Sequence, residues 1–308
     1  MAHAQTVPVT AAAHSGLMRR AALFSLALAV TLIAIKTIAY FATESVSMLA
    51  SLADSGLDFV ASLLNFLAIR HALEPADAEH RFGHGKAEPL SGLAQGAFIA
   101  GSATFLVIES VNRILAPQPV AHETLGVAVM VFSIAGTVAL IFFQQRVVRE
   151  TGSLAVGADR AHYASDLVVN LGVIAGIVLA SRFGLPLADP IIAILIAGVL
   201  AGSAWRVFRV SYDQLMDREL PDAEREKIKA IILQHDAVRA LHDLRTRMAG
   251  VNTFIQFHIE LDPGITLLRA HTLSDAVEAD LQKAFPNAEI LIHQDPAGFE
   301  MPPALAQS

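Results

Sequence analysis

The stretch Leu52-Ala53-Asp54-Ser55-Gly56-Leu57-Asp58 places two carboxylates four residues apart inside a long apolar segment. Side chains at positions i and i+4 lie on one face of a helix. Ionised acids are costly to bury in a membrane, and there they usually mark an ion pathway. His162 and Asp166 repeat the spacing in another apolar segment. The two pairs could face a bundle interface as ordinary polar residues, or together form a tetrahedral site for a divalent metal.

The composition indicates a membrane protein. The chain has 308 residues, of which 54% are hydrophobic and 17% are charged, whereas soluble domains carry about 25% charged residues. The formal charge of -7 argues against nucleic acid as a partner. The chain has no cysteine, so any metal must be bound by His, Asp, Glu, Gln or backbone groups.

Six apolar segments are long enough to span a bilayer, which takes roughly 20 residues each. We therefore predict an α-helical membrane protein with six transmembrane helices at residues 17–211, between a disordered tail at 1–16 and a cytoplasmic domain at 212–296. Residues 297–308 form a second tail. The predicted spans are 17–42, 46–72, 88–115, 121–146, 154–181 and 186–210.

The distribution of basic residues predicts the orientation of the chain. Lys and Arg gather in cytoplasmic loops. Beyond Arg113 and Arg182, one side of the predicted bundle has few basic residues. Both termini should therefore be cytoplasmic. The basic residues on the other side are Arg19, Arg20, Arg70, Arg81, Lys86, Arg146, Arg149, Arg160, Arg206 and Arg209.

The composition becomes more polar after Tyr212, and the pattern predicts a small α/β domain of order α-β-β-α-β. Pro221-Asp222 opens a helix, and Gly250-Val251-Asn252 joins strands 240–249 and 252–261 in a hairpin. A helix at 266–285 precedes a short strand at 289–293. Alternation along the second strand puts His258 on its polar face, opposite Phe257 and Ile259.

Two further groups could bind metal. Asp77, His80 and His84 lie within eight residues of a predicted cytoplasmic loop, where Gly83 and Gly85 favour a tight turn. The alternative is a solvated charged loop. The predicted α/β domain is enriched in histidine, and several of these residues fall at strand ends, which favours a metal site over ordinary surface residues. Its candidate ligands are His242, His258, His271, His293 and Asp295.

Three motifs resemble the cation diffusion facilitator family, and most closely its bacterial zinc and ferrous-iron efflux branch. They are Ser-Leu-Ala-Asp54-Ser-Gly-Leu-Asp58, Arg81-Phe-Gly-His84-Gly-Lys86-Ala-Glu and Asp159-Arg-Ala-His162-Tyr-Ala-Ser-Asp166. The resemblance implies a homodimer in the bacterial inner membrane with a metallochaperone-like cytoplasmic domain. It also implies a transport site of Asp54, Asp58, His162 and Asp166, a loop site, a binuclear cytoplasmic site with Gln294 as a further ligand, and a charge pair of Lys86 with Asp217.

The predicted activity is export of divalent metal from the cytoplasm in exchange for protons, without enzymatic chemistry. Imidazole favours zinc and iron over manganese, so zinc is the expected substrate and regulatory ligand, with cadmium or Fe(II) as further substrates. His162 is the expected proton carrier. The alternatives are the same transporter with Fe(II), Mn or Co as its main substrate, and a membrane-anchored metal sensor without flux. An intramembrane metalloenzyme has no His-Glu-x-x-His motif to support it.

Overall fold

The computed structural model describes residues 9–43, 46–115, 124–183 and 188–298. The chain divides into two compact units, residues 1–212 and 213–308. Residues 116–123 and 184–187, where predicted spans meet, and most of the predicted tail at 297–308 lie outside the described residues.

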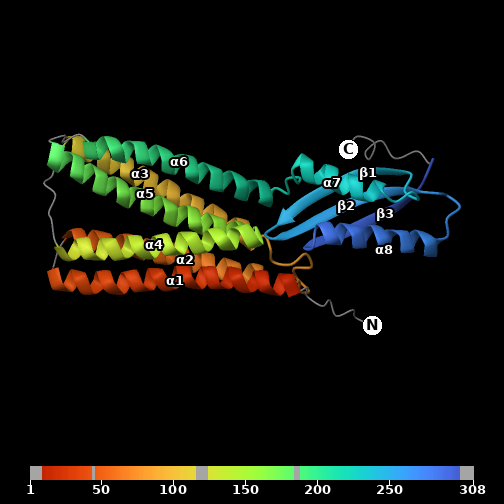
Figure 1. The fold of residues 1–308 in the computed structure, drawn as a ribbon, viewed down its shortest axis with the longest axis horizontal. Helices are drawn as coiled ribbons and strands as arrows, with labels where there is room; N and C mark the ends of the chain where they lie inside the picture. Colours follow the sequence, from red (N-terminus) through yellow and green to blue (C-terminus); the bar gives the residue numbers. More distant parts are fainter. Residues whose placement is uncertain (1–8, 44–45, 116–123, 184–187, 299–308) are drawn as a thin grey trace. The chain divides into compact units, whose positions relative to one another are not determined.

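The first unit is built from long helices (Figure 1). Their order matches the predicted order of apolar segments, and the last of them ends just beyond the boundary of the unit. The helices are α1 (Val9–Thr43), α2 (Val46–Ala72), α3 (Ala87–Leu115), α4 (Thr124–Thr151), α5 (Leu154–Phe183) and α6 (Ala188–Leu215).

Among the described residues, five helices contain stretches long and apolar enough to cross a membrane. The helix not among them is α5, which carries the polar residues Asp159, His162 and Asp166. Two of these residues, His162 and Asp166, are the ones for which the sequence predicts ion binding. The five stretches are Ala13–Ala42, Ser51–Ala72, Ala87–Asn112, Ala128–Thr151 and Pro190–Leu215.

The predicted disordered tail at 1–16 is wrong for its second half, because α1 begins at Val9. The run Ala11-Ala12-Ala13 follows directly, and alanine has the highest helix propensity of all residues. The helix therefore starts before the apolar segment that would lie in the bilayer.

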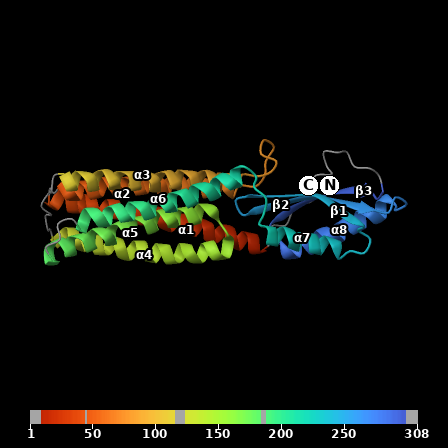
Figure 2. The ribbon, with the colours of Figure 1, turned by 90° about the horizontal axis from the view of Figure 1, so that it is seen from above.

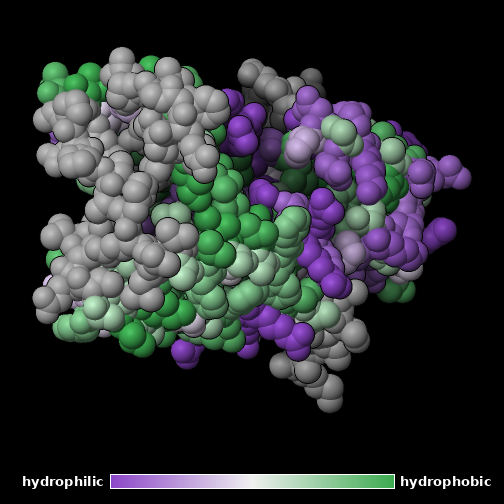
Figure 3. Space-filling model, turned by 60° about the vertical axis from the view of Figure 1, so that its left-hand side comes forward, coloured by the Kyte–Doolittle hydropathy of each residue, from purple (hydrophilic) through white to green (hydrophobic). Residues whose placement is uncertain are grey.

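Buried apolar clusters hold the helices together. Leu28, Leu140 and Tyr163 pack α1, α4 and α5 against one another, while Ile99 and Leu200 join α3 to α6. Facing outward, large apolar side chains remain exposed over the same helices, and Figure 3 shows them as a broad hydrophobic surface. Soluble proteins rarely expose continuous apolar areas of this kind, so this surface is consistent with contact to lipid.

The second unit is a two-layer α/β sandwich, as predicted (Figure 1). Strand β2 lies at the centre of the sheet, antiparallel to β1 and parallel to β3. Its core joins Ile228 of the first helix and Val277 of the second to Ile255, Phe257 and Ile259 of β2. Both helices therefore cover one face of the sheet (Figure 2). The elements are α7 (Asp222–Leu233), β1 (Ala240–Ala249), β2 (Asn252–Leu261), α8 (Leu267–Ala284) and β3 (Ala288–Pro296).

Helical and α/β units in this order confirm the fold class predicted from the sequence. The fold also leaves alternate β2 side chains, including His258 and Glu260, on the face of the sheet opposite the helices.

Ile255→Ala should destabilise the second unit by about 2–5 kcal/mol, because it leaves a cavity at a fully buried position. In the purified full-length protein, deuterium exchange of β1 and β2 amides should accelerate by about 30-fold or more, since 1.4 kcal/mol corresponds to a factor of ten. Leu268→Ala, on the exposed first turn of α8, is the matched control and should leave exchange unchanged. Equal exchange in both variants would contradict this assignment of the core.

Candidate metal sites

The first candidate site lies between α2 and α5, within the helical unit. Asp58 of α2 meets His162 and Asp166 of α5, and one potential ligand atom from each lies within 4.8 Å of the others. The Nε2 atom of His162 lies 3.4 Å from Oδ1 of Asp58 and 3.7 Å from Oδ2 of Asp166. The i,i+4 spacing brings the two α5 residues to one helix face. The structure thus brings together three of the four residues proposed for this site.

Several polar atoms of this cluster are buried without a hydrogen bond among the residues that the structure describes. They are both ring nitrogens of His162 and Oδ2 of Asp166. Burying a polar group without a partner costs roughly 1–3 kcal/mol in proteins. Two carboxylates and an imidazole arranged in this way suit a divalent cation of borderline softness, such as zinc.

Asp54 is placed differently. It lies one helical turn before Asp58 on α2, its side chain is exposed, and it does not belong to the group of neighbouring ligand atoms found in the described chain. A rotation of α2 or of its side chain would be needed for Asp54 to contact the same ion. Its part in the site remains a prediction.

The sequence interpretation missed a buried lysine close to this region. Lys36 of α1 donates from Nζ to the Ser51 carbonyl at 3.0 Å and to the Ser55 hydroxyl at 2.6 Å. Ser55 directly follows Asp54, so a fixed cation lies within about one turn of the two carboxylates of α2. Its sequence signal is the single charge between Arg20 and Glu44 in an otherwise apolar stretch.

Buried hydrogen bonds hold α5 against the neighbouring helices. Asp159, fully buried one turn before His162, accepts from Gln144 Nε2 at 2.6 Å and from Gln95 Nε2 at 3.4 Å. Tyr163 shares a hydrogen bond of 2.7 Å with Ser62. These contacts tie α5, the helix that carries His162 and Asp166, to α2, α3 and α4.

The second candidate site is the loop after α2, where the structure brings together all three predicted residues. Asp77, His80 and His84 form a group of neighbouring ligand atoms, and Nε2 of the buried His84 lies 3.3 Å from Oδ2 of Asp77. The amide hydrogen bonds from His80 and Glu79 outweigh desolvation and lower the pKa of Asp77. That carboxylate is therefore ionised at neutral pH and available to a cation.

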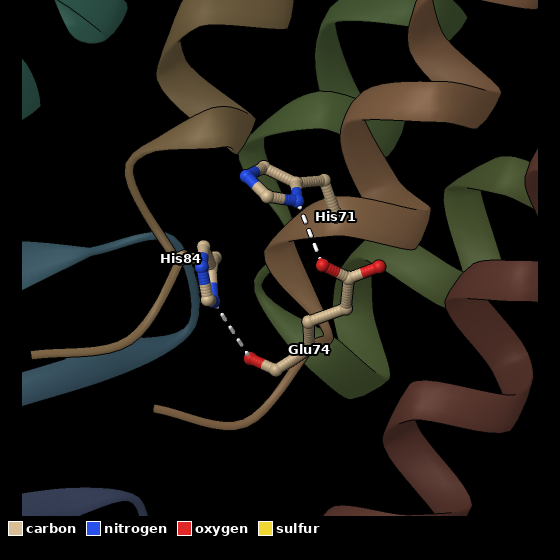
Figure 4. A group of neighbouring side chains, drawn as sticks. All are labelled: His71, Glu74 and His84. Carbon is tan, nitrogen blue, oxygen red and sulfur yellow. Dashed lines mark hydrogen bonds and ion pairs between the residues drawn. The ribbon is translucent and has the colours of Figure 1, made fainter. Parts of the chain in front are cut away.

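His71 and Glu74, which the sequence interpretation did not select, adjoin the same loop (Figure 4). His71 lies in the last turn of α2 and Glu74 two residues beyond it, and both belong with His84 to a further group of neighbouring ligand atoms. The i,i+3 spacing of His71 and Glu74 was the available signal, but only the fold of the loop brings His84 to them.

The third candidate site lies on the open face of the sheet in the second unit. Strand register pairs His242 with His258 across β1 and β2, and His258 with His293 across β2 and β3. Directly paired residues have Cβ atoms about 4.5–5.5 Å apart. Three histidines therefore stand in a row across the three strands, with Asp295 two residues further along β3.

The closest group at this third site is His242, His258 and Asp295. Oδ2 of Asp295 lies 2.8 Å from Nδ1 of His258 and 3.2 Å from Nε2 of His242. Burial raises the pKa of Asp295, but the hydrogen bond from His258 and the neighbouring imidazoles outweigh it, so that its pKa is lowered overall. Both ring nitrogens of His242 are buried without a hydrogen bond in the described chain, which fits a metal-ligand role. His293 lies beside the group, with its ring 4.4 Å from that of His258.

Two predicted ligands are not brought into this group. His271 lies on α8, largely exposed, with Asp275 at 3.6 Å as an ion-pair partner. Gln294 donates from Nε2 to Ser274 of α8 at 2.7 Å. Within one chain, both residues are associated with α8, and not with the open face of the sheet.

The predicted charge pair of Lys86 with Asp217 joins residues of two separate units, and it stays a prediction. Within its own unit, Asp217 has a φ of 53° and pairs with Arg247 at 3.4 Å.

The chain matches known proteins along almost its full length. The family model described as the cation efflux transmembrane domain matches residues 22–216, and that of the cation efflux protein cytoplasmic domain matches residues 220–297. The cation-efflux pump FieF of Shewanella oneidensis is 48% identical over 276 residues, which cover 90% of this chain and 93% of the relative. FieF of Serratia proteamaculans is 44% identical, covering 92% and 94%.

The solved metal-bound C-terminal domain of the CzcD transporter from Thermotoga maritima is also similar. It has 26% sequence identity and a TM-score of 0.25, covering 27% of this chain and 100% of that domain. The two family matches and the full-length relatives show that this chain belongs to the cation efflux family of membrane-spanning transporters.

Proposed function

We propose that this cation efflux transporter exports zinc from the cytoplasm in exchange for protons, with cadmium or Fe(II) as further substrates. Asp58, His162 and Asp166 bind the transported ion, and Asp54 joins them in part of the cycle. The observation that carries the proposal is their convergence from two helices, with buried polar atoms that have no hydrogen bond among the described residues.

The exchange follows from the charge of the site. Two carboxylates and a histidine between membrane helices require a neutralising cation or protons, because isolated charges are costly there. Ligands must lose protons to bind metal, so metal and protons compete for the same atoms. Metal displaces protons on the cytoplasmic side, and protonation of His162 and the carboxylates releases metal on the other side.

The wider assembly completes the proposal. The protein works as a homodimer in the bacterial inner membrane, with both termini in the cytoplasm. Zinc favours the transport-ready dimer when it is bound by His242, His258 and Asp295, with His293 beside them. A separate charge pair, Lys86 with Asp217, locks the membrane and cytoplasmic domains. The family match of the second unit to the cation efflux cytoplasmic domain supports the homodimer. A metal sensor would bind the same ions without flux.

Asp166→Asn should lower zinc transport into proteoliposomes by more than about a hundredfold, because removing a direct ligand should exceed the 10–100-fold effect of an outer-shell partner. Zinc uptake and proton movement are followed together with zinc- and pH-sensitive dyes. Asp222→Asn, an almost fully exposed carboxylate, is the control and should transport normally. Zinc binding without any flux in the unmodified protein would favour the sensor instead.

His162→Asp should change metal preference, since it converts the site to oxygen ligands that suit manganese. The ratio of zinc to manganese uptake should fall at least about tenfold, which corresponds to 1.4 kcal/mol of differential binding. Competition between the two ions in the same vesicles gives this ratio directly. An unchanged ratio would show that His162 does not contact the transported ion.

His258→Ala should raise the zinc concentration for half-maximal transport about tenfold, as expected for losing a ligand at a regulatory site. The maximal rate should remain near normal, because the site between α2 and α5 is intact. His235→Ala, a histidine of the same unit that pairs with Asp280 and belongs to no proposed site, is the matched control. Normal transport by His258→Ala at every zinc concentration would remove the regulatory role.

A further inference from the structure

We propose that His71, Glu74 and His84 form a second divalent-metal position beside the loop site, and that it shares His84 with Asp77 and His80. One ion occupies either position, and it passes between them by exchanging two ligands while His84 stays bound. Asp77, His80 and His84 form the position predicted from the loop sequence. The second position uses two residues at the end of α2 that no part of the transport proposal requires.

The arrangement around His84 carries the inference. Its side chain is 4% exposed, although it belongs to a polar loop. The ring of His71 has its centroid 4.4 Å away and that of His80 has its centroid 4.6 Å away, so imidazoles from α2 and from the loop both lie against it. A buried histidine therefore lies between two others, and each of the three has a carboxylate within 3.3 Å.

The distances fit a metal with modest side-chain movement. One ligand atom from each of His71, Glu74 and His84 lies within 4.8 Å of the others, and Nδ1 of His71 already lies 2.8 Å from Oε2 of Glu74 (Figure 4). Zinc bonds of about 2.0–2.2 Å in a tetrahedron place ligand atoms roughly 3.3–3.6 Å apart. The ion would replace the contact between His71 and Glu74.

The local structure holds the position together. His71 belongs to the last turn of α2. Just after the helix, the Leu73 amide donates to the Ile69 carbonyl at 3.2 Å and so keeps the helical hydrogen-bond pattern. The Glu74 carbonyl lies 3.4 Å from Nδ1 of His84, so Glu74 contacts one histidine through its backbone and the other through its carboxylate. Glu74 is thus the residue that joins the helix end to the returning loop.

The ligand set indicates the class of ion. Two imidazoles and one carboxylate are a known set for zinc sites that keep a fourth position open to water. An open position favours ligand exchange over permanent binding. His71 and Glu74 are each about half exposed, so an ion can enter and leave from solvent. Binding here does not depend on the transport proposal, so either could fail without the other.

Cobalt binding to the full-length protein tests the second position. The starting variant carries Asp166→Ala and His258→Ala, which disable the other two sites, and Co²⁺ is followed by its visible absorption and by calorimetry. We expect one ion per chain. Adding Asp77→Ala should weaken binding by less than about tenfold, because the ion moves to His71, Glu74 and His84.

Adding His71→Ala to the Asp77→Ala variant should weaken binding by more than about a hundredfold, beyond the effect of losing an outer-shell partner. Glu74→Gln on the Asp77→Ala variant, which keeps size and shape, should also weaken it. Glu79→Ala is the control, since this loop carboxylate belongs to neither group of ligand atoms. Thermal unfolding and gel-filtration profiles identify any variant that has not folded, and only folded variants are compared.

Two results would overturn the proposal. In the first, Asp77→Ala alone abolishes cobalt binding, so the end of α2 cannot hold the ion. In the second, His71→Ala leaves the affinity of the Asp77→Ala variant unchanged, so its remaining binding does not involve His71.

Discussion

The structure depends on one electrostatic constraint, the placement of Asp58, His162 and Asp166 among membrane-spanning helices. Charged groups in such surroundings must be paired, protonated or bound to a cation. No fixed salt bridge from Lys or Arg to these three residues exists among the ion pairs of the described chain. In the function proposed above, protons or a bound cation that can leave balance the charge of these three residues, which distinguishes a carrier from a structural ion pair.

Polar residues around the site hold α5 in place against its neighbouring helices. Asp159 is held by the amides of Gln95 and Gln144, and Tyr163 by Ser62. Asp159 precedes His162 on α5 and Tyr163 follows it. Their hydrogen bonds reach three other helices, so the imidazole of His162 has a fixed position against α2. Lys36, bonded to the backbone and hydroxyl of α2, places a further cation near the carboxylates.

Much of the site was predictable because helix periodicity is local. The i,i+4 pairs of α2 and α5 placed Asp58, His162 and Asp166 correctly on facing helices. Asp54 lies outside the ligand group. Tertiary packing sets the rotation of α2 about its axis, and this rotation decides which of the two carboxylates reaches the neighbouring helix. In the same way, the helical start at Val9 depends on alanine propensity and not on the apolar pattern of the membrane segment.

The second unit shows where sequence reasoning stops. Strand parity put His258 on the open face, but its alignment with His242 and His293 depends on register, and a bulge after His242 displaces β1 there. His271 shared the residue type but lies on α8. His71 and Glu74 were missed because nothing local predicts that His84 folds back onto the end of α2. Contacts between residues distant along the chain require the fold itself.

The most direct test of the account is the ligand shell of zinc between α2 and α5. It uses the full-length protein with His84→Ala and His258→Ala, which removes the loop and sheet sites. X-ray absorption spectroscopy should then show one bound zinc with oxygen ligands and one imidazole. The imidazole signal should disappear when His162→Asn is added. A zinc shell without imidazole, or an imidazole signal that survives His162→Asn, would contradict the account.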